Sequence, residues 1–558
     1  MRAAAGRTSI GRAKNTCNDS LGQKYKYSRC LSAKCIIDLS ALLHKMTFTP
    51  LKHVVFVPGP SWGHLRPGLK TSLRMVEKFP DLFISLFVYH TEVPRAIKYL
   101  SGQPSVYSRR IKVVTASSSD VPPPVDSGNL VEMLAYMEES FKLWITNELQ
   151  QAAVVQTEGQ PVSAPSLIIE DIFNGGMSLG CKDVHKLPLV AWWLMTAASL
   201  MILTGNNESG HEAGVIDSLA LLSVQGEQDL FTKAGEVYLQ EVSDRLIRIP
   251  GLPAHHEWEL NTQYLPFVPP FLVFMVPRVK NMLRHVDTIV CCTTFEMEPI
   301  SAASLSNAFD KPITPFFIGP SVDLTPPHRA DPESSVTQFL DRAFAEKGAH
   351  SVIYVAFGTV FFPLPESASH LMAALDEIPK AGFKFIFALS SAHAQIDKSW
   401  MDAHVQAGSG IFPEWTNQTA VLEHPAIHYF LSHGGWNSST EALVRGVPMI
   451  FWPFIGDQPT NAMQIATVHD CGFELLQVRT GPAKSTAYQN GAEIEITGTD
   501  DAVREEVKRV LELSRGSRGE HQRVNVRLLG RVISDSLAPG GSGDFGLESF
   551  GRACDLLR

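Results

Sequence analysis

Residues 415–458 read WTNQTAVLEHPAIHYFLSHGGWNSSTEALVRGVPMIFWPFIGDQ, and this stretch decides the fold class. Its apolar run at Ile427–Ser432 predicts a buried strand, and a helix is expected from about Asn437. Gly434 and Gly435 lie between the two, where they allow a tight turn and a close approach of the backbone to a ligand. A helix that starts there presents free N–H groups and the positive end of its dipole, so the turn is suited to bind a diphosphate.

Polar side chains around this turn supply further hydrogen-bonding groups. His433, Asn437 and Ser438 can donate to phosphate oxygens. Glu441 follows one helical turn later, where its carboxylate can accept from ribose hydroxyls. A second interpretation stays open, because Ser438 and Glu441 also have the spacing of a capping box that satisfies the N–H groups of the helix itself.

The two ends of the stretch carry residues that are ambiguous when taken singly. Trp415 is compatible with a core position, but an exposed indole there could stack on a uracil ring. Trp436 alone is typical of a core residue. Asp457 and Gln458 together could form an acceptor and a donor for sugar hydroxyls, and they equally suit an ordinary helix start.

Taken whole, the stretch closely resembles the donor-binding box of the family 1 UDP-glycosyltransferases, the small-molecule glycosylating enzymes of plants, fungi and bacteria. The match runs over 44 residues without a gap (458 − 415 + 1). Ser351–Thr359 likewise resembles the first strand of the family's donor domain and its phosphate-proximal turn. The positions in register are Trp415, Gln418, His424, Pro425, His433, Gly435, Trp436, Asn437, Ser438, Glu441, Gly446, Pro448, Pro453, Asp457, Gln458 and, just beyond, Asn461.

The resemblance implies a UDP-sugar as co-substrate and a role for each donor-binding residue. Three departures from the family pattern are Gly434 in place of Cys, His428 in place of Gly, and Thr416-Asn417 in place of Cys-Pro; none removes a side chain with an implied role. The implied roles are stacking on uracil for Trp415, ribose binding for Gln418 and Glu441, diphosphate binding for His433, Asn437 and Ser438 with help from Thr359, and contact with the transferred sugar for Trp436, Asp457 and Gln458.

The organisation of the chain agrees with this resemblance. Short apolar runs alternate with helical patterns, which is typical of βαβ units and a parallel sheet. The resemblance implies an α/β fold of the GT-B type, in which two Rossmann-like domains face each other across a cleft. The expected parts are a disordered basic extension over 1–46, an acceptor-binding domain over 47–320, a linker over 321–335, a UDP-sugar-binding domain over 336–520, and a tail over 521–558 that packs back on the first domain.

The catalytic groups are expected in the first half. Sugar transfer to an alcohol needs a base, and His64 follows the first predicted strand, Lys52–Pro58, at the edge where ligands sit in open α/β sheets. Asp171 follows the strand Ser166–Glu170 and could hydrogen-bond the imidazole, although it could instead cap the next helix. Both turns resemble the family's catalytic pair. Glu170 is the alternative carboxylate, but its side chain should point to the opposite face.

Composition excludes several other classes of protein. The net charge is 48 − 57 = −9, which is unfavourable for a nucleic-acid binder. No stretch suits a stable membrane span. Eight cysteines without a C-x-x-C pair indicate reduced thiols and no structural zinc, and they favour a cytoplasmic protein. Sequons at Asn417 and Asn437 inside the donor box agree, because a glycan there would block the site. No Asp-x-Asp is present, so we expect no metal and no cofactor.

The acceptor is expected to be a lipophilic hydroxylated small molecule. Leu189–Leu203 and Tyr264–Pro277 are strongly apolar, and the corresponding regions line the acceptor cleft in the family. Because Tyr264–Pro277 contains four prolines, we expect a loop there rather than a regular helix. Gln458 suits a UDP-glucose donor by resemblance. The alternatives are a non-catalytic sugar-nucleotide-binding homologue, a sterol or lipid glycosyltransferase, and a dinucleotide oxidoreductase, the last disfavoured because no G-x-G-x-x-G follows the first strand.

Overall fold

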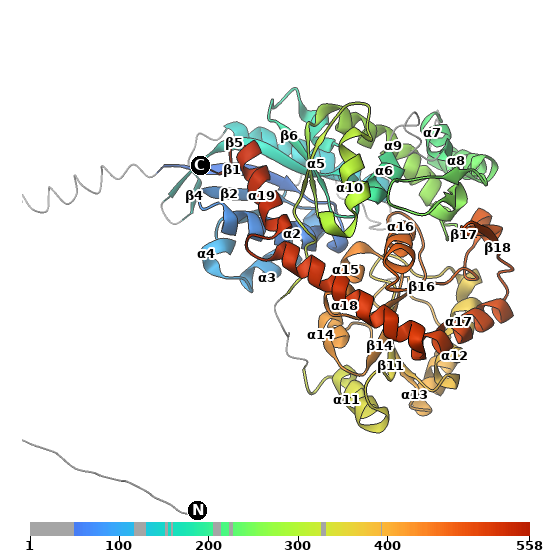
Figure 1. The fold of residues 1–558 in the computed structure, drawn as a ribbon. Helices are drawn as coiled ribbons and strands as arrows, with labels where there is room; N and C mark the ends of the chain where they lie inside the picture. The colour runs from blue at the N-terminus through green and yellow to red at the C-terminus, as the bar shows by residue number, and fades with distance from the viewer. Residues whose placement is uncertain are drawn as a thin grey trace, which may run out of the picture. The chain divides into compact units, whose positions relative to one another are not determined.

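A parallel sheet of almost wholly apolar strands forms the centre of residues 51–317 (Figure 1). Its strands run in the order β10-β9-β6-β5-β1-β2-β3, and β4 pairs with β5 in the antiparallel sense. Strands that are buried on both faces form continuous apolar runs, which is why the sequence predicts most of them closely. The bounds are β1 Leu51–Val57, β2 Leu82–Phe87, β3 Ile111–Val114, β4 Val155–Thr157, β5 Gln160–Asp171, β6 Leu189–Trp193, β9 Thr288–Cys291 and β10 Thr314–Phe317.

A second parallel sheet occupies residues 352–474, with the order β13-β12-β11-β14-β15-β16. In chain order this is 3-2-1-4-5-6, the doubly wound arrangement of a Rossmann fold. Two small antiparallel hairpins complete the strands of the described chain. The bounds are β11 Val352–Ala356, β12 Lys384–Ala388, β13 Gly410–Ile411, β14 Ile427–Ser432, β15 Met449–Phe451 and β16 Gly472–Glu474 for the sheet, and β7 Leu246–Ile247, β8 His255–His256, β17 Thr486–Gln489 and β18 Ala492–Glu495 for the hairpins.

Each sheet has one topological switch point, where the winding reverses. In the first sheet it lies between β1 and β5, and in the second between β11 and β14. Ligands of doubly wound folds bind beyond the carboxyl ends of the strands at this point. The predicted base, His64, follows β1, its predicted partner, Asp171, is the last residue of β5, and the predicted phosphate-binding turns follow β11 and β14. The topology therefore places both predicted sites where such folds bind ligands.

Two helices differ from the sequence prediction. α2 begins at Trp62, not near Pro67, so His64 lies in its first turn rather than on a loop. The loop expected over Tyr264–Pro277 is wrong, because helix α9 spans Val268–His285. Pro269 and Pro270 occupy the first turn of α9, where the backbone N–H groups would have no partner in the helix anyway. Within α9, Pro277 alone lies in the interior of the helix, where it removes one backbone hydrogen bond.

The remaining helices connect the strands or follow the second sheet. They are α2 Trp62–Lys78, α3 Val93–Ser101, α4 Ser105–Ser108, α5 Leu130–Gln150, α6 Ala197–Thr204, α7 Gly214–Ala220, α8 Glu227–Glu241, α10 Pro299–Ser304, α11 Ser335–Lys347, α12 Ala368–Lys380, α13 Lys398–Gln406, α14 Gln418–Glu423, α15 Trp436–Val444, α16 Gln458–Ala462, α17 Asp500–Arg515, α18 Ser517–Leu537 and α19 Ser542–Ala553.

The last two helices return to the first sheet. Figure 1 shows α18 running from α17 towards α19. In α19, Phe550 packs on Phe316 of β10 with ring centroids 5.9 Å apart, and Asp544 accepts hydrogen bonds from Lys78 of α2 at 2.9 and 3.0 Å. Apolar and charged contacts together therefore hold the end of the chain against the first sheet.

The structure describes residues 49–116, 130–150, 155–157, 160–204, 214–222, 227–324, 331–391 and 393–557. Residues 50–558 form one compact unit, which includes both sheets. The predicted extension over 1–46 lies outside the described residues, and the predicted domain limits stay predictions. Across the described ranges, no helix is both long and apolar enough to cross a membrane.

Candidate active site

One cavity of about 550 Å³ lies where the two switch points meet within this unit. Its apolar walls include Trp62, Leu194, Met195 and Phe361. Every predicted site residue except Asp171 lines it, namely His64, Thr359, Trp415, Gln418, His433, Trp436, Asn437, Ser438, Glu441, Asp457 and Gln458. The cavity is thus lined by residues that are far apart in the sequence.

The predicted catalytic pair is in direct contact. His64 Nδ1 lies 2.7 Å from Asp171 Oδ2, and the Asp171 side chain is fully buried. Because this carboxylate oxygen also accepts the Gly59 N–H at 3.0 Å, Nδ1 is the protonated ring nitrogen that donates to it. This leaves Nε2 as an acceptor on the side chain that lines the cavity.

Asp171 fulfils both interpretations that the sequence left open. Its Oδ1 accepts the Phe173 N–H at 2.9 Å and so caps the short helix Ile172–Asn174, while Oδ2 holds His64. Glu170 points elsewhere, since its Oε2 accepts the Ser178 N–H at 3.2 Å. Burial raises the pKa of Glu170 to about 7. The alternation along β5 therefore selects Asp171 as the partner of the imidazole.

The turns after β11 and β14 form a cradle with little room for side chains. Gly358 and Gly434 both adopt positive φ, at 76° and 84°. A Cβ on Gly358 would lie 3.1 Å from the ring of His433. Burial lowers the pKa of His433 to about 4, so the ring is neutral at neutral pH and can act as a hydrogen-bond donor but not as a positive charge. Thr359 follows directly at the same turn.

The N–H group of Trp436, the first residue of helix α15, donates to the Asp457 carboxylate at the edge of the cavity. The N-cap residue of the helix is Gly435, so the alternative in which Ser438 and Glu441 form a capping box is wrong. Those two side chains instead meet Gln418, whose Nε2 lies 2.8 Å from Glu441 Oε2 and 3.3 Å from Ser438 Oγ. The indole of Trp415 is 60% exposed, so the core interpretation of this residue is wrong and a flat face is left open at the cavity.

Trp415 provides the first testable prediction. If the indole stacks on uracil, Trp415→Ala should weaken UDP binding by about 1–3 kcal/mol, while Trp415→Phe keeps most of the affinity. Because the side chain is exposed, neither change should alter the melting temperature. Titration calorimetry with UDP measures this, and equal affinities for the wild type and Trp415→Ala would remove the residue from the site.

Several predicted sugar-facing residues also hold the protein together. The Trp436 indole is buried and donates to the Cys292 carbonyl at 2.9 Å, as the core interpretation expects. Asp457 Oδ2 accepts from the Trp436 N–H at 3.2 Å and from Asn461 at 2.6 Å, and burial raises the pKa of Asp457 to about 6. Gln458 Oε1 accepts the Phe454 N–H at 2.9 Å. These bonds shape the loop that borders the cavity.

Two polar contacts across the cavity involve helix α2. Asn437 donates to the Gly63 carbonyl at 2.7 Å, next to His64. Arg66 forms an ion pair with Glu441. Sequence reasoning missed Arg66, because its partner lies 375 residues away and the helix was expected to begin later. In the sequence, Arg66 was distinguished only by its position two residues after His64.

The apolar segment predicted to line the acceptor cleft does so only in part. Trp192 and Trp193 of β6 are buried in the core, and the Trp193 indole donates to the Thr196 carbonyl at 2.7 Å. Leu194 and Met195, which follow β6, reach the cavity. No residue of α9 lines this cavity, but Phe271 of α9 packs on Phe173 with ring centroids 5.5 Å apart, and the Phe173 ring lies 4.5 Å from that of His64. The role predicted for Tyr264–Pro277 at the acceptor cleft stays a prediction.

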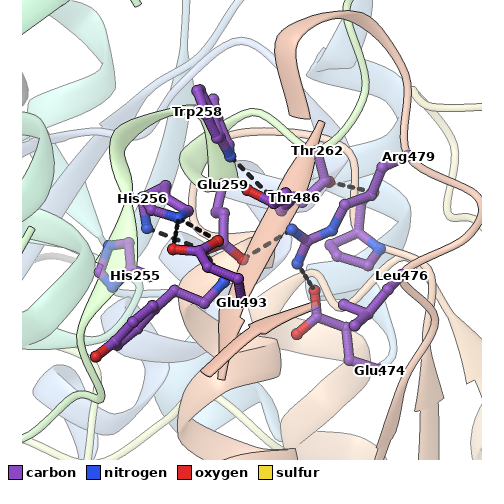
Figure 2. A network of polar contacts seen from close by, with 12 residues as sticks. His255, His256, Trp258, Glu259, Thr262, Glu474, Leu476, Arg479, Thr486 and Glu493 are labelled. Atoms are coloured by element: carbon purple, nitrogen blue, oxygen red, sulfur yellow. Dashed lines mark hydrogen bonds and ion pairs between the residues drawn. The ribbon is translucent and has the colours of Figure 1, made fainter. Parts of the chain in front are cut away.

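A buried ion network joins the segment before α9 to the second half of the chain (Figure 2). Arg479 donates to Glu259 at 2.7 Å and to Glu474 at 2.8 Å, and all three side chains are at most 4% exposed. Close by, Thr262 donates to the Pro453 carbonyl at 2.6 Å. The segment before α9 therefore supports the second sheet beside the donor loop.

The comparisons with known proteins support the resemblance seen in the sequence. The model of the family described as "UDP-glucoronosyl and UDP-glucosyl transferase" matches residues 314–481. The chain is similar to UDP-glycosyltransferase eriJ of Hericium erinaceus, at 26% identity over 499 residues, which cover 85% of this chain and 93% of the relative. It is also 23% identical to UDP-glycosyltransferase 71A15 of Malus domestica over 532 residues, covering 90% and 99%.

Solved structures show the same fold. Phytolacca americana UGT2, complexed with UDP-2fluoro-glucose and pterostilbene, superposes with a TM-score of 0.63 at 20% identity and covers 90% of this chain and 99% of its own. Medicago truncatula UGT71G1, complexed with UDP-glucose, gives a TM-score of 0.62 at 18% identity, covering 90% and 98%. The predicted GT-B fold and the predicted resemblance are both confirmed.

Proposed function

We propose that this chain, a UDP-glycosyltransferase of the GT-B fold that acts on small molecules, transfers glucose from UDP-glucose to a hydroxyl of a lipophilic acceptor with inversion at the anomeric carbon. The observation that carries the proposal is the 2.7 Å contact between His64 and Asp171 at the same cavity as the donor cradle. A non-catalytic binder would have no need to keep a base paired with a buried carboxylate there.

In the proposed reaction, Nε2 of His64 accepts the proton of the acceptor hydroxyl. The acceptor oxygen forms a bond to the anomeric carbon as the bond from that carbon to the β-phosphate oxygen breaks, and the electron pair leaves with UDP. Asp171 holds the imidazole in the correct tautomer and stabilises the imidazolium that forms. Attack from the side opposite the leaving group inverts the anomeric configuration.

The charge that develops on UDP is met by hydrogen-bond donors. Helix α15 begins at the cavity, and its first turn offers the positive end of the helix dipole and the N–H groups that follow Trp436, whose own N–H donates to Asp457. His433, Asn437, Ser438 and Thr359 surround the same region. We propose that these donors suffice for the diphosphate, so that the reaction needs neither a metal ion nor a cofactor.

The residues that line the cavity support a donor sugar and a class of acceptor. Gln458 borders the cavity, and its counterpart in the family suits glucose. Trp62, Leu194, Met195 and Phe361 give the rest of the cavity an apolar wall, which favours a lipophilic acceptor such as a phenolic, a terpenoid or a polyketide. Two structural neighbours were solved with UDP-glucose or with UDP-2fluoro-glucose and pterostilbene.

A cytoplasmic location is also proposed. Asn437 lies in a sequon, and its side-chain amide donates to the Gly63 carbonyl inside the site, so a glycan on this nitrogen would break the contact and block the cavity. Cell fractionation with a glycosidase control tests this, and a glycosylated luminal pool would contradict it.

The function is tested by UDP release from UDP-glucose against a panel of hydroxylated aromatic and terpenoid acceptors, in buffer with and without EDTA. We expect release that depends on the acceptor and is unchanged by EDTA. Binding of UDP without release for any donor or acceptor would instead favour a non-catalytic binder, and loss of activity with EDTA would contradict the metal-free mechanism.

A further inference from the structure

The carboxylate of Glu441 is held from both halves of the chain. Its Oε2 accepts from Gln418 of α14 at 2.8 Å, and its Oε1 accepts from a guanidinium nitrogen of Arg66 on α2. The Glu441 side chain is 3% exposed, whereas that of Arg66 is 26% exposed. All three residues line the cavity. The ion pair therefore stands at the wall of the donor site rather than on the outer surface.

Such a buried carboxylate needs a cation to stay charged. Burial raises the pKa of Glu441, but the charge and hydrogen bond of Arg66, together with the Gln418 hydrogen bond and the charge of Lys70, bring the pKa below its ordinary value. Lys70, one turn along α2, has its own partner in Asp323 at 2.5 Å. Arg66 is thus the cation that directly keeps Glu441 ionised.

The hydrogen bonds of Glu441 leave part of its capacity unused. An ionised carboxylate offers about four acceptor positions on its two oxygens. Gln418 and Arg66 occupy one position on each oxygen, so one position on each remains. Two vicinal hydroxyls, such as O2′–H and O3′–H of a ribose, match these two positions.

We propose that Arg66 is a positioning residue that makes the donor site select ribonucleotides over 2′-deoxyribonucleotides. Arg66 keeps Glu441 ionised and holds one of its two oxygens in place. The carboxylate then keeps a buried acceptor position that only the 2′-hydroxyl of the ribose fills. A nucleotide without this hydroxyl leaves the acceptor unpaired in a desolvated site. The inference rests on the proposed function, in which Glu441 binds the ribose of the donor.

Through the same contact, α2 takes part in donor binding as well as in carrying the proposed base. His64 and Arg66 lie two residues apart on this helix, so the ion pair ties the ribose site to the helix that carries the proposed base. Replacement of Arg66 should therefore raise KM for the UDP-sugar and leave KM for the acceptor nearly unchanged. A general loss of folding would change both.

The test is titration calorimetry of UDP and 2′-deoxyuridine 5′-diphosphate with the full chain, which needs no acceptor and no turnover. The variants are Arg66→Met, Arg66→Lys and Glu441→Gln, with Arg284→Gln as control, since Arg284 is an exposed arginine of α9 that does not line the cavity. We expect the wild type and Arg284→Gln to prefer UDP by about tenfold or more, because an unsatisfied buried acceptor costs about 1–3 kcal/mol.

Arg66→Met and Glu441→Gln should still bind UDP, but their preference for the ribonucleotide should fall below about threefold. Arg66→Lys should be intermediate, because lysine keeps the charge but not the planar fork. If Arg66→Met binds UDP with the wild-type preference, the inference is wrong while the proposed function stands. If the wild type binds neither nucleotide, the proposed function fails, and the inference fails with it.

Discussion

His64→Ala should lower kcat by about 10²–10⁴-fold while the affinity for UDP stays within about twofold of wild type. The substitution removes the only imidazole that is paired with Asp171, but His64 is not among the residues proposed to hold the nucleotide. Initial rates of acceptor-dependent UDP release, with UDP titrations in parallel, measure the two effects separately.

Asp171→Asn is the matched variant for the pair. The amide keeps the shape of the carboxylate, but it removes the charge that stabilises an imidazolium and one acceptor for the Gly59 and Phe173 N–H groups. We expect kcat to fall with little change in UDP affinity, which also reports that the variant is folded. Full activity of His64→Ala would show that another group removes the proton.

Arg479→Met should destabilise the protein by about 3–5 kcal/mol, because it leaves Glu259 and Glu474 buried without their cation. Glu259 also accepts the His256 and Tyr488 N–H groups, so its carboxylate cannot turn to solvent without breaking further bonds. The same change should weaken UDP-sugar binding, since this segment supports the loop that carries Asp457 and Gln458. Urea unfolding measures the stability.

The control is Arg518→Met. Arg518 also pairs with a carboxylate, Asp470 at 2.6 Å, but its side chain is 49% exposed. An exposed pair of this kind contributes about 1 kcal/mol or less. Equal urea midpoints for the two variants would mean that the Arg479 network does not hold the segment in place.

Much of the fold was predictable from the sequence, because strands buried on both faces are continuous apolar runs. Ile427–Ser432 has its predicted bounds, β1 is shifted by one residue from the predicted Lys52–Pro58, and β5 begins six residues before the predicted Ser166. The helix over Val268–His285 was missed because the prolines of Tyr264–Pro277 were counted without regard to position: Pro266 precedes the helix, and Pro269 and Pro270 lie in its first turn, where proline is tolerated.

The site was predictable where its residues are close in sequence or follow the strands at a switch point. This accounts for the donor box and for His64 and Asp171, which the structure brings within hydrogen-bonding distance. Pairs that join distant segments were not predictable, because no local pattern links Arg66 to Glu441 or Arg479 to Glu259. Trp436 combines both interpretations, since its buried indole donates to the Cys292 carbonyl while the residue also lines the cavity, and its contact with the sugar stays a prediction.

The anomeric configuration of the product tests the central claim most directly. UDP-glucose carries an α-linked glucose, and the H1–H2 coupling of the purified glycoside, measured by NMR, reports the linkage in the product. A single displacement with His64 as base predicts a β-glycoside from the wild type and almost none from His64→Ala. An α-glycoside would contradict direct inversion at this site.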